Sequence, residues 1–340
     1  MRRELLMAEF LSTPWALEPG YLAAFASVLQ RWQGRDQPSA DVRTAVAGDA
    51  AIMAARKQEI AATPRVGQAG NIAVLPLYGV LTQRGNMANE LSGSGATSLQ
   101  QFTQALRAAL RDPEIDGVLV EIDSPGGSVY GLDELASEIL ASRGTKPIVG
   151  LANSIAASGG YWVGAACSEL YVVPGGEVGS VGVFTGHDDL SEALKKSGVK
   201  KTFISAGKFK VEGNPYEPLS AEAQAHMQQR VDEYYDAFTK TVARGREVPV
   251  ARVLRDFGQG RVLGANQALT AGMVNGVATF DQVVQKMGRN IKSTGRMNGT
   301  NRSAPRLAHA LRTLEIEKLV EPRVVARPAT AAQRYLDSLK

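Results

Sequence analysis

One serine stands out as a candidate for chemistry because of the residues around it. Residues 153–162 read NSIAASGGYW, and Ser158 lies between small residues, after a predicted strand and at the predicted start of a helix. Open α/β folds bind ligands beyond the carboxyl ends of their strands, and the first amides of a helix favour negative charge. Ser158 is thus a candidate nucleophile, and the alternative is that it only caps the helix.

A second glycine-rich turn also follows a predicted strand. Residues 121–128 read EIDSPGGS, in which Pro125 and two glycines make a tight turn between a strand and a helix. The exposed amides of this turn, together with the amide of Gly159, are suited to bind the oxyanion of a tetrahedral intermediate. An ordinary strand-to-helix turn would have the same composition, so the segment alone does not decide between the two.

A serine hydroxyl is a weak nucleophile and needs a base to accept its proton. The imidazoles in the chain are those of His187, His226 and His309. Two of them fall in a predicted helix and in the tail, which leaves His187, followed by two aspartates, for a Ser/His pair. Lys210, in the segment SAGKFKVEGNPY, is the other candidate, because a lysine amine becomes a base once burial or a positive neighbour removes its charge.

Composition limits the classes to which the chain can belong. Its 340 residues exceed one average domain, and 44% hydrophobic with 21% charged residues are values typical of globular proteins. Cys167 is the single cysteine, so no intramolecular disulfide can form, and no cluster of cysteine with histidine has the spacing of a zinc site. We expect no metal and no cofactor.

Charge and hydropathy bear on membranes and partners. Residues 286–340 hold 12 Lys or Arg against 4 Asp or Glu, so the basic character of the chain belongs to its tail. Such a tail can contact nucleic acid or an acidic partner, although a solvated extension is the simpler interpretation. No run of eighteen apolar residues occurs, and Pro14 and several glutamates interrupt the first apolar stretch. We therefore expect no signal peptide, no membrane span and a cytosolic address.

The hydrophobic pattern predicts the elements that must position these residues. Residues 1–33 and about 50–62 are predicted to be helical, and an amphipathic stretch lies near 307–319. From Gly70 onward apolar strands alternate with helices, which predicts an α/β domain with a mostly parallel sheet. The predicted strands are 72–77, 117–122, 148–152, 170–173, 181–184 and 202–204. The predicted helices are 98–111, 129–142 and 220–244, the last capped by Ser220.

Five segments, in order, resemble the signal peptide peptidase A family of serine proteases, which share the crotonase-like fold of the Clp protease. They are IAVLPLYGVL, EIDSPGGSVYGLDELASEI, ANSIAASGGYWVGAACSELYVVPGGEVGSVGVF, ISAGKFKVEGNPYEPLS and GRVLGANQALTAGMVNGV. The resemblance covers roughly Gly70 to Val284. It implies a crotonase- or Clp-protease-like α/β peptidase domain at 70–287, a helical extension and linker at 1–69, and a basic, partly disordered tail at 288–340.

The resemblance also implies roles for single residues. Ser158 matches the nucleophile of the family and Lys210 its general base, which together make a Ser/Lys dyad. Ser180 matches the serine that orients the lysine amine. Under this interpretation Lys208 flanks the base and His187 is structural.

The same resemblance implies an oxyanion hole and a pocket. The hole would use the amide of Gly127, with that of Gly126 as the second choice, and the amide of Gly159. We expect the substrate pocket to be small or apolar and to lie near Tyr161 and Trp162, whose aromatic rings could equally belong to the core. Because a lysine base must be uncharged, activity should rise with pH into the alkaline range.

The opening of the chain, with a helix ending in LQRW and a linker before GNIAVLPLYG, resembles the head maturation proteases of tailed phages and prophages. This implies an endopeptidase that acts inside the procapsid in the host cytoplasm. Its substrates would be scaffold, portal or other head proteins, and the protease itself. We also expect a homo-oligomer, since crotonase-fold subunits form trimers, hexamers or larger rings and this family often builds its active site near subunit contacts.

Three alternatives remain at this point. The chain could be a cytosolic bacterial protease like the signal peptide peptidases, although membrane-bound members carry an anchoring helix. It could be an acyl-coenzyme A hydratase, in which two glycine-rich turns also form an oxyanion hole but no serine is acylated. It could be an assembly or scaffold protein whose dyad is vestigial. A fluorophosphonate probe separates the protease from the hydratase, and coexpression of a Ser158→Ala variant with candidate head proteins tests the assembly protein.

Overall fold

The computed structural model describes residues 14–17, 72–84 and 96–297. The helices predicted near 50–62 and 307–319 fall outside these ranges, as does most of the helix predicted for 1–33. Within residues 1–33, the predicted helix is wrong for Trp15–Leu17, which forms a strand, β1. These three residues are extended because they pair with the backbone of residues 126–128 on one side and of Phe184 on the other.

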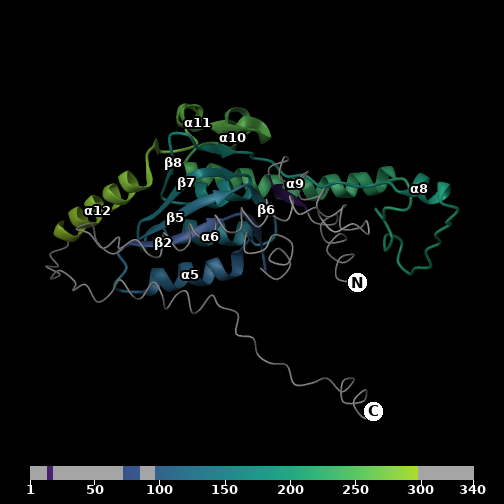
Figure 1. Ribbon diagram of the computed structural model, residues 1–340, viewed down its shortest axis with the longest axis horizontal. Helices are drawn as coiled ribbons and strands as arrows, with labels where there is room; N and C mark the ends of the chain where they lie inside the picture. The colour runs from purple at the N-terminus through teal and green to yellow at the C-terminus, as the bar shows by residue number, and fades with distance from the viewer. Residues whose placement is uncertain (1–13, 18–71, 85–95, 298–340) are drawn as a thin grey trace, which may run out of the picture. The chain divides into compact units, whose positions relative to one another are not determined.

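A mainly parallel sheet forms the centre of the fold, which confirms the predicted α/β class (Figure 1). Its strands are β2 (Ile72–Tyr78), β5 (Gly117–Ser124), β7 (Ile148–Ala157), β8 (Glu169–Val172), β9 (Glu177–Gly179), β10 (Val262–Gly264) and β11 (Gly276–Val277). The order is β10-β9-β7-β5-β2, and β8 joins β7 to β11. Strand β7 pairs with β8 through its first half and with β9 through its second half, so its end lies at a fork in the sheet.

Helices cover both faces of this sheet. They are α5 (Leu99–Arg111), α6 (Leu132–Ser142), α7 (Gly159–Ala165) and α12 (Phe280–Met297). On β5, Val118 and Ile122 join the apolar core shared with α5, α6 and α7, whereas Leu119 joins a second cluster with Val283 and Met287 of α12. Because alternate residues of a strand point to opposite faces, a nearly continuous apolar run is what a strand covered on both sides requires.

A smaller sheet stands next to the turn that follows β5. It comprises β3 (Val80–Thr82), β4 (Ala96–Ser98) and β6 (Gly126–Ser128) together with β1, in the order β1-β6-β3-β4. Strand β6 contains the two glycines of the EIDSPGGS segment. It pairs in parallel with β3 and antiparallel with β1, so both of its edges are occupied.

The remaining elements follow β9. They are α8 (Ser191–Lys196), α9 (Ala221–Arg246), α10 (Val250–Asp256), the 3-10 turn η1 (Gly258–Gly260) and α11 (Ala265–Ala271). Helix α9 begins as predicted, since the Ser220 hydroxyl accepts a hydrogen bond from the Ala223 amide at 3.1 Å. Its carboxyl-terminal half packs on α7, and its amino-terminal half extends away from the sheet with α8 near its end (Figure 1).

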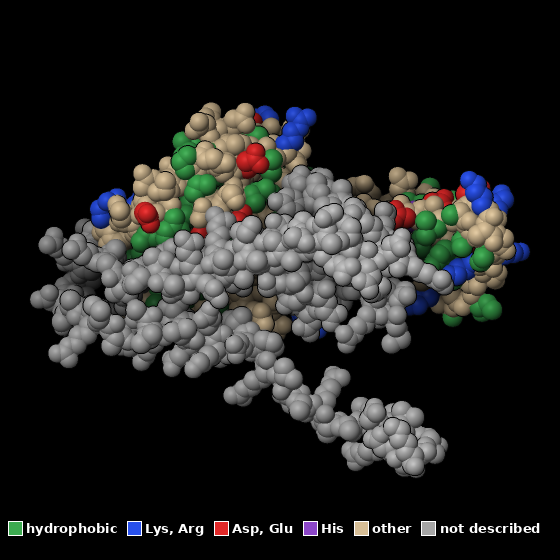
Figure 2. Space-filling model, viewed as in Figure 1, with side chains coloured by type: hydrophobic (Ala, Val, Ile, Leu, Met, Phe, Trp, Pro, Cys, Tyr) green, Lys and Arg blue, Asp and Glu red, His purple; other side chains and the backbone are tan. Residues whose placement is uncertain are grey.

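We call residues 188–236, which include α8 and the outer part of α9, the arm. Several large apolar side chains of the arm are exposed to solvent: Leu190, Val199, Phe203, Ile204 and Phe209. Ile204 is 98% exposed. Figure 2 shows hydrophobic and Lys or Arg side chains together on this end of the molecule. Isolated apolar residues are common on surfaces, but five between residues 190 and 209 make this segment unusually apolar for an exposed one.

Two predicted strands were wrong. Residues 202–204 have no strand conformation and are exposed, and residues 181–184 pair with other backbone only at Phe184. Both runs are apolar, but they lie beyond the edge of the sheet. The strand in this part of the chain is β9, whose three residues precede Ser180.

Helix α12 ends the described part of the chain. Helix α12 continues through Gly288 to Met297, because Val283 and Met287 anchor it to the sheet and the residues after them continue the same helix. At the other end, β2 begins just after Gly70. Among the described helices, none is long and apolar enough to cross a bilayer.

Candidate active site

Ser158 occupies the sharp corner between β7 and α7. Its φ of +50° and ψ of −115° are values that a residue with a side chain seldom adopts. Two backbone hydrogen bonds hold the corner: the Ser158 amide donates to the Gly179 carbonyl at 2.7 Å, and the Trp162 amide donates to the Ser158 carbonyl at 2.9 Å. The Ser158 side chain is only 1% exposed, so its hydroxyl is fixed and shielded from bulk water.

The turn before β6 presents one glycine amide to this corner. The Ser124 hydroxyl donates to the Gly79 carbonyl at 2.7 Å and accepts from the Gly126 amide at 3.1 Å, so the Gly126 amide already has a partner. Gly126 has φ +100°, and a Cβ on it would come 2.8 Å from the Gly159 amide nitrogen. A Cβ on Gly127 would come 2.0 Å from the Leu81 carbonyl oxygen. Both glycines are therefore required for the two chain segments to approach each other.

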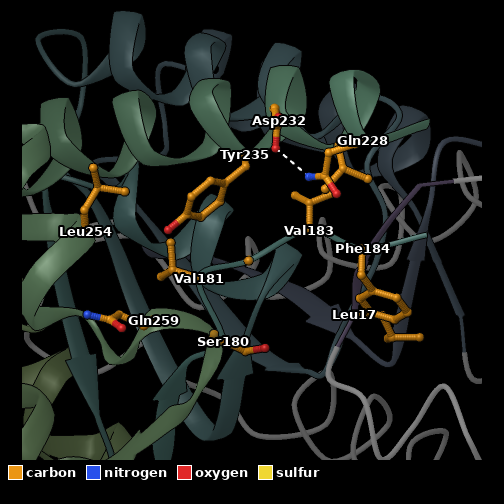
Figure 3. A pocket seen from close by; sticks show the side chains of 13 residues that line it. Leu17, Ser180, Val181, Val183, Phe184, Gln228, Asp232, Tyr235, Leu254 and Gln259 are labelled. Atoms are coloured by element: carbon orange, nitrogen blue, oxygen red, sulfur yellow. Dashed lines mark hydrogen bonds between the residues drawn. The ribbon is translucent and has the colours of Figure 1, made fainter. Parts of the chain in front are cut away.

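A cavity of about 650 Å³ lies between residues 180–184 and helix α9 (Figure 3). The Ser158 hydroxyl lies 3.4 Å from the Gly182 carbonyl oxygen, and Gly182 is part of the cavity wall. Ser180 also lines the cavity; it is 4% exposed, its φ is +53°, and its amide donates to the Arg261 carbonyl at 2.8 Å. Helix α9 forms the opposite wall, where the Gln228 amide donates to the Asp232 carboxylate at 2.7 Å.

Lys210 does not meet Ser158 within one chain. It lies on the arm with an exposed side chain, and no described residue hydrogen-bonds to its amine or forms an ion pair with it. Its neighbour Lys208 pairs with Glu222 in the first turn of α9 at 2.8 Å. From that turn to Gln228, the first residue of α9 that lines the cavity, the helix rises about 9 Å. A single chain thus brings together the serine and the glycine amides but not the lysine.

His187 is half-buried, and its Nε2 atom is buried without a hydrogen-bond partner among the described residues. The carboxylate of Asp189 accepts from the Ser191 amide at 2.9 Å, which caps the start of α8. Of the described atoms, only the Gly182 carbonyl oxygen is within hydrogen-bonding distance of the Ser158 hydroxyl, so the structure provides no Ser/His pair.

Tyr161 and Trp162 belong to the core, which corrects the expectation that they line the substrate pocket. Both are 0% exposed. Trp162 stacks on Phe238 of α9 with ring centroids 4.4 Å apart, and the Tyr161 hydroxyl donates to the Met273 carbonyl at 3.0 Å. In a helix that begins at the nucleophile, these side chains point into the protein because the sheet and α9 enclose them.

Sequence reasoning missed residues 14–17, which cross the site. Strand β1 lies between β6 and Phe184, and its Ala16 pairs with Gly127. The segment STPWALEP carries no motif, and the surrounding residues suggested a helix. Only the three-dimensional arrangement brings this strand to the serine. No group of three His, Cys, Asp or Glu side chains suited to a metal ion occurs in the described part of the chain.

A buried serine at a strained strand-to-helix corner, with a glycine turn facing it, is the arrangement of a serine hydrolase. Residues 141–293 match the model of peptidase family S49. This match covers the segment that holds Ser158 and confirms the resemblance predicted from the motifs.

Two phage proteins are similar to this chain over most of its length. The head-tail preconnector protein GP5 of Enterobacteria phage P21 is 32% identical over 87% of this chain, and the capsid assembly protease C of Escherichia phage lambda is 31% identical over 81%. The chain spans only 60% and 63% of the lengths of these two relatives. A putative signal peptide peptidase SppA of Enterococcus faecium is 29% identical, over 66% of this chain and 64% of its own length.

Proposed function

We propose that this chain is a serine endopeptidase whose nucleophile is Ser158. The hydroxyl attacks the carbonyl carbon of a peptide bond, and the amides of Gly127 and Gly159 stabilise the oxyanion that develops. One observation supports this most: the Ser158 corner is strained and buried, and it lies beside Gly126 and Gly127, where the site has no room for a side chain. Strain of this kind persists where the surrounding structure enforces it, and it is concentrated at functional sites.

Lys210 is the proposed base, and a neighbouring subunit supplies it. A lysine amine accepts the serine proton only where it is shielded from water and uncharged, and Lys210 is exposed in a single chain. The exposed apolar side chains of the arm, including Phe203, Ile204 and Phe209, give it a surface to bury against another copy. The cavity beside Ser180 is open and has room for an incoming side chain. Ser180 is then in position to hydrogen-bond the amine and orient it.

The proposed substrates are phage head proteins. This rests on the two phage relatives, one of them a capsid assembly protease, and on their similarity over more than four fifths of this chain. Scaffold and portal proteins inside a procapsid are the expected targets, and the enzyme would act as a homo-oligomer there. The similarity to signal peptide peptidases supports the second candidate, a bacterial protease with other protein substrates.

The function is tested with a fluorophosphonate probe on the purified full chain. We expect labelling of Ser158, no labelling of Ser158→Ala, and hydrolysis of an unfolded protein such as casein by the wild-type chain only. A hydratase or an assembly protein with a vestigial site would stay unlabelled. Coenzyme A binding without labelling would assign the hydratase.

The shared dyad is tested by complementation. Ser158→Ala and Lys210→Ala each remove turnover, and co-expression of the two should restore it at roughly a quarter of the sites if subunits assort at random in a closed oligomer. Lys208→Ala is the matched control, because it removes a neighbouring arm lysine that pairs with Glu222, and it should keep wild-type turnover. A mixture as inactive as its components would show that the lysine acts within its own chain or not at all.

A further inference from the structure

Residues 14–17 lie in the site as an extended peptide, hydrogen-bonded along both edges. On one edge, the Trp15 amide donates to the Phe184 carbonyl at 2.8 Å, and the Phe184 amide donates to the Trp15 carbonyl at 3.0 Å. On the other edge, the Val129 amide donates to the Pro14 carbonyl at 3.2 Å. Addition of an extended strand to exposed sheet edges is a general way in which proteins bind peptides.

The register of this strand determines which carbonyl faces the glycine amides. In an antiparallel pair, every second pair of residues exchanges hydrogen bonds. Since Pro14 accepts from Val129 and Ala16 pairs with Gly127, the next hydrogen-bonded pair is Ala16 with Gly127. The Gly127 amide therefore faces the Ala16 carbonyl, while Trp15 directs its amide and carbonyl to Phe184.

The same carbonyl oxygen is close to the rest of the proposed oxyanion hole. A Cβ on Gly126 would come 2.1 Å from the Ala16 oxygen and 3.0 Å from the Ser158 Cβ, and a Cβ on Gly159 would come 3.2 Å from the Ala16 oxygen. The Ala16 carbonyl thus lies between the β6 turn and the start of α7, with the nucleophile beside it. This is the position that the carbonyl of a peptide bond must take to be attacked.

The side chains on either side of that carbonyl fit the walls around them. Ala16 is 0% exposed and points into the main apolar core, where there is room for a methyl group. Leu17 is 2% exposed and lines the cavity together with Phe184 (Figure 3). Because side chains alternate along a strand, a residue larger than Ala16 would have to displace core side chains, whereas the Leu17 position opens on the cavity.

We infer that the Ala16–Leu17 peptide bond is a bond that the chain cleaves in itself. The inference rests on the proposed function. Ser158 Oγ bonds to the Ala16 carbonyl carbon, and its proton passes through the base to the Leu17 nitrogen as the Ala16–Leu17 bond breaks. One water then hydrolyses the Ala16 ester on Ser158, which leaves a carboxylate on Ala16, an amine on Leu17 and a free serine hydroxyl.

The experiment compares the intact masses and amino-terminal sequences of the purified wild-type chain and of Ser158→Ala. We expect the wild-type product to begin at Leu17 and the variant to keep the preceding residues. A wild-type chain that is labelled by fluorophosphonate and hydrolyses casein, yet is uncut at this bond, would overturn the inference and leave the proposed function intact. An unlabelled, inactive chain would instead overturn the proposed function.

Variants of the strand separate recognition from folding. Ala16→Phe should lower self-cleavage about tenfold or more, because the larger ring does not fit the buried position. Leu17→Met, of similar volume, is the matched control and should still be cut. A peptide with the sequence STPWALEPG should be cut between Ala and Leu, and the same peptide with Phe for Ala should resist. Equal cutting of both peptides would contradict the assigned register.

Discussion

The backbone of Ser158 is the clearest sign that this residue has a task beyond packing. Its positive φ would suit a glycine, yet a serine occupies the corner and hydrogen bonds to Gly179 and Trp162 hold it there. A side chain in this conformation costs about 1–3 kcal/mol. The rest of the fold offsets this conformational free energy, and the strained backbone holds the serine hydroxyl at the corner.

The strain predicts an order of stabilities among variants of the nucleophile. Ser158→Gly should be more stable than Ser158→Ala by about 1 kcal/mol, since glycine adopts this conformation without a steric penalty. Urea unfolding of the two inactive variants, followed by circular dichroism, measures the difference. If the alanine variant were equally stable or more stable, the corner would not be strained.

At Gly127, an added methyl group should remove activity. The Cβ of Gly127→Ala would come 2.0 Å from the Leu81 carbonyl oxygen, so β6 must shift and carry its amide away from the oxyanion. We expect kcat to fall by roughly two to three orders of magnitude, the usual effect of losing one oxyanion donor. Gly144→Ala is the control, because no heavy atom lies within 4 Å of its added Cβ, and casein hydrolysis by that variant should match the wild type.

At the scale of elements, one arginine side chain connects helices α6, α7 and α9 through hydrogen bonds. Arg143, just after α6, donates hydrogen bonds to four carbonyl oxygens, those of Ala165, Ala166, Cys167 and Gly245. Burial lowers the pKa of Arg143, with smaller opposing effects from nearby groups. A planar guanidinium satisfies the carbonyls at the end of α7 and one from α9 at the same time.

We expect Arg143→Ala to lower the free energy of unfolding by about 3 kcal/mol, because it leaves several carbonyl oxygens without a donor. Arg143→Lys should recover part of this loss, as an ammonium group reaches fewer of the four oxygens. Chemical denaturation monitored by tryptophan fluorescence gives both values. A loss under 0.5 kcal/mol for the alanine variant, the scale of an ordinary surface substitution, would show that water replaces the guanidinium.

The sequence predicts elements well where local pattern and packing agree. Strand β5 has an uninterrupted apolar run, and the cap at Ser220 begins α9, so both were predictable. Residues 202–204 include Phe203 and Ile204, yet they are exposed and form no strand. Strand β1 shows the opposite case. Its extended conformation depends on hydrogen bonding to β6 and to Phe184, which no local pattern of residues reveals.

The same distinction applies to the site. Ser158 and the glycines after Ser124 belong to segments in which the turn itself requires particular residue types, so the sequence identified them. The burial of Tyr161 and Trp162 depends on α9 crossing over them, more than seventy residues later in the chain, and periodicity within α7 could not show it. The surroundings of Lys210 depend, under the proposed function, on a second chain.

At the scale of the whole molecule, buried acids set the alkaline limit of stability. Burial raises the pKa of the Cys167 thiol from 9.0 to about 12, and it raises the pKa of the Tyr161 phenol well above 10.0. Both groups are neutral when protonated, so the folded state holds these protons at pH values where the unfolded chain releases them. Their stabilisation is complete below about pH 9 and is lost as the pH rises toward 12.

Cys167→Ala should make this dependence shallower. The variant is expected to be less stable at pH 7, because it loses buried contacts, but to lose less of its free energy of unfolding between pH 8 and pH 11. Urea titrations across that range measure the slope, and equal slopes for the two proteins would exclude a role for the thiol.

Helices α7 and α9 pack directly on each other, and α9 continues from this contact into the arm. The two backbones touch where a Cβ on Gly245 would come 2.1 Å from the Ala165 carbonyl oxygen, and Trp162 stacks on Phe238 one step further out. Because α9 is continuous from Ala221 to Arg246, its contact with α7 connects the outer end of α9 to the helix that starts at the nucleophile. Under the proposed function, a neighbouring chain that binds the arm contacts the same continuous helix that packs on α7, the helix that begins at the nucleophile.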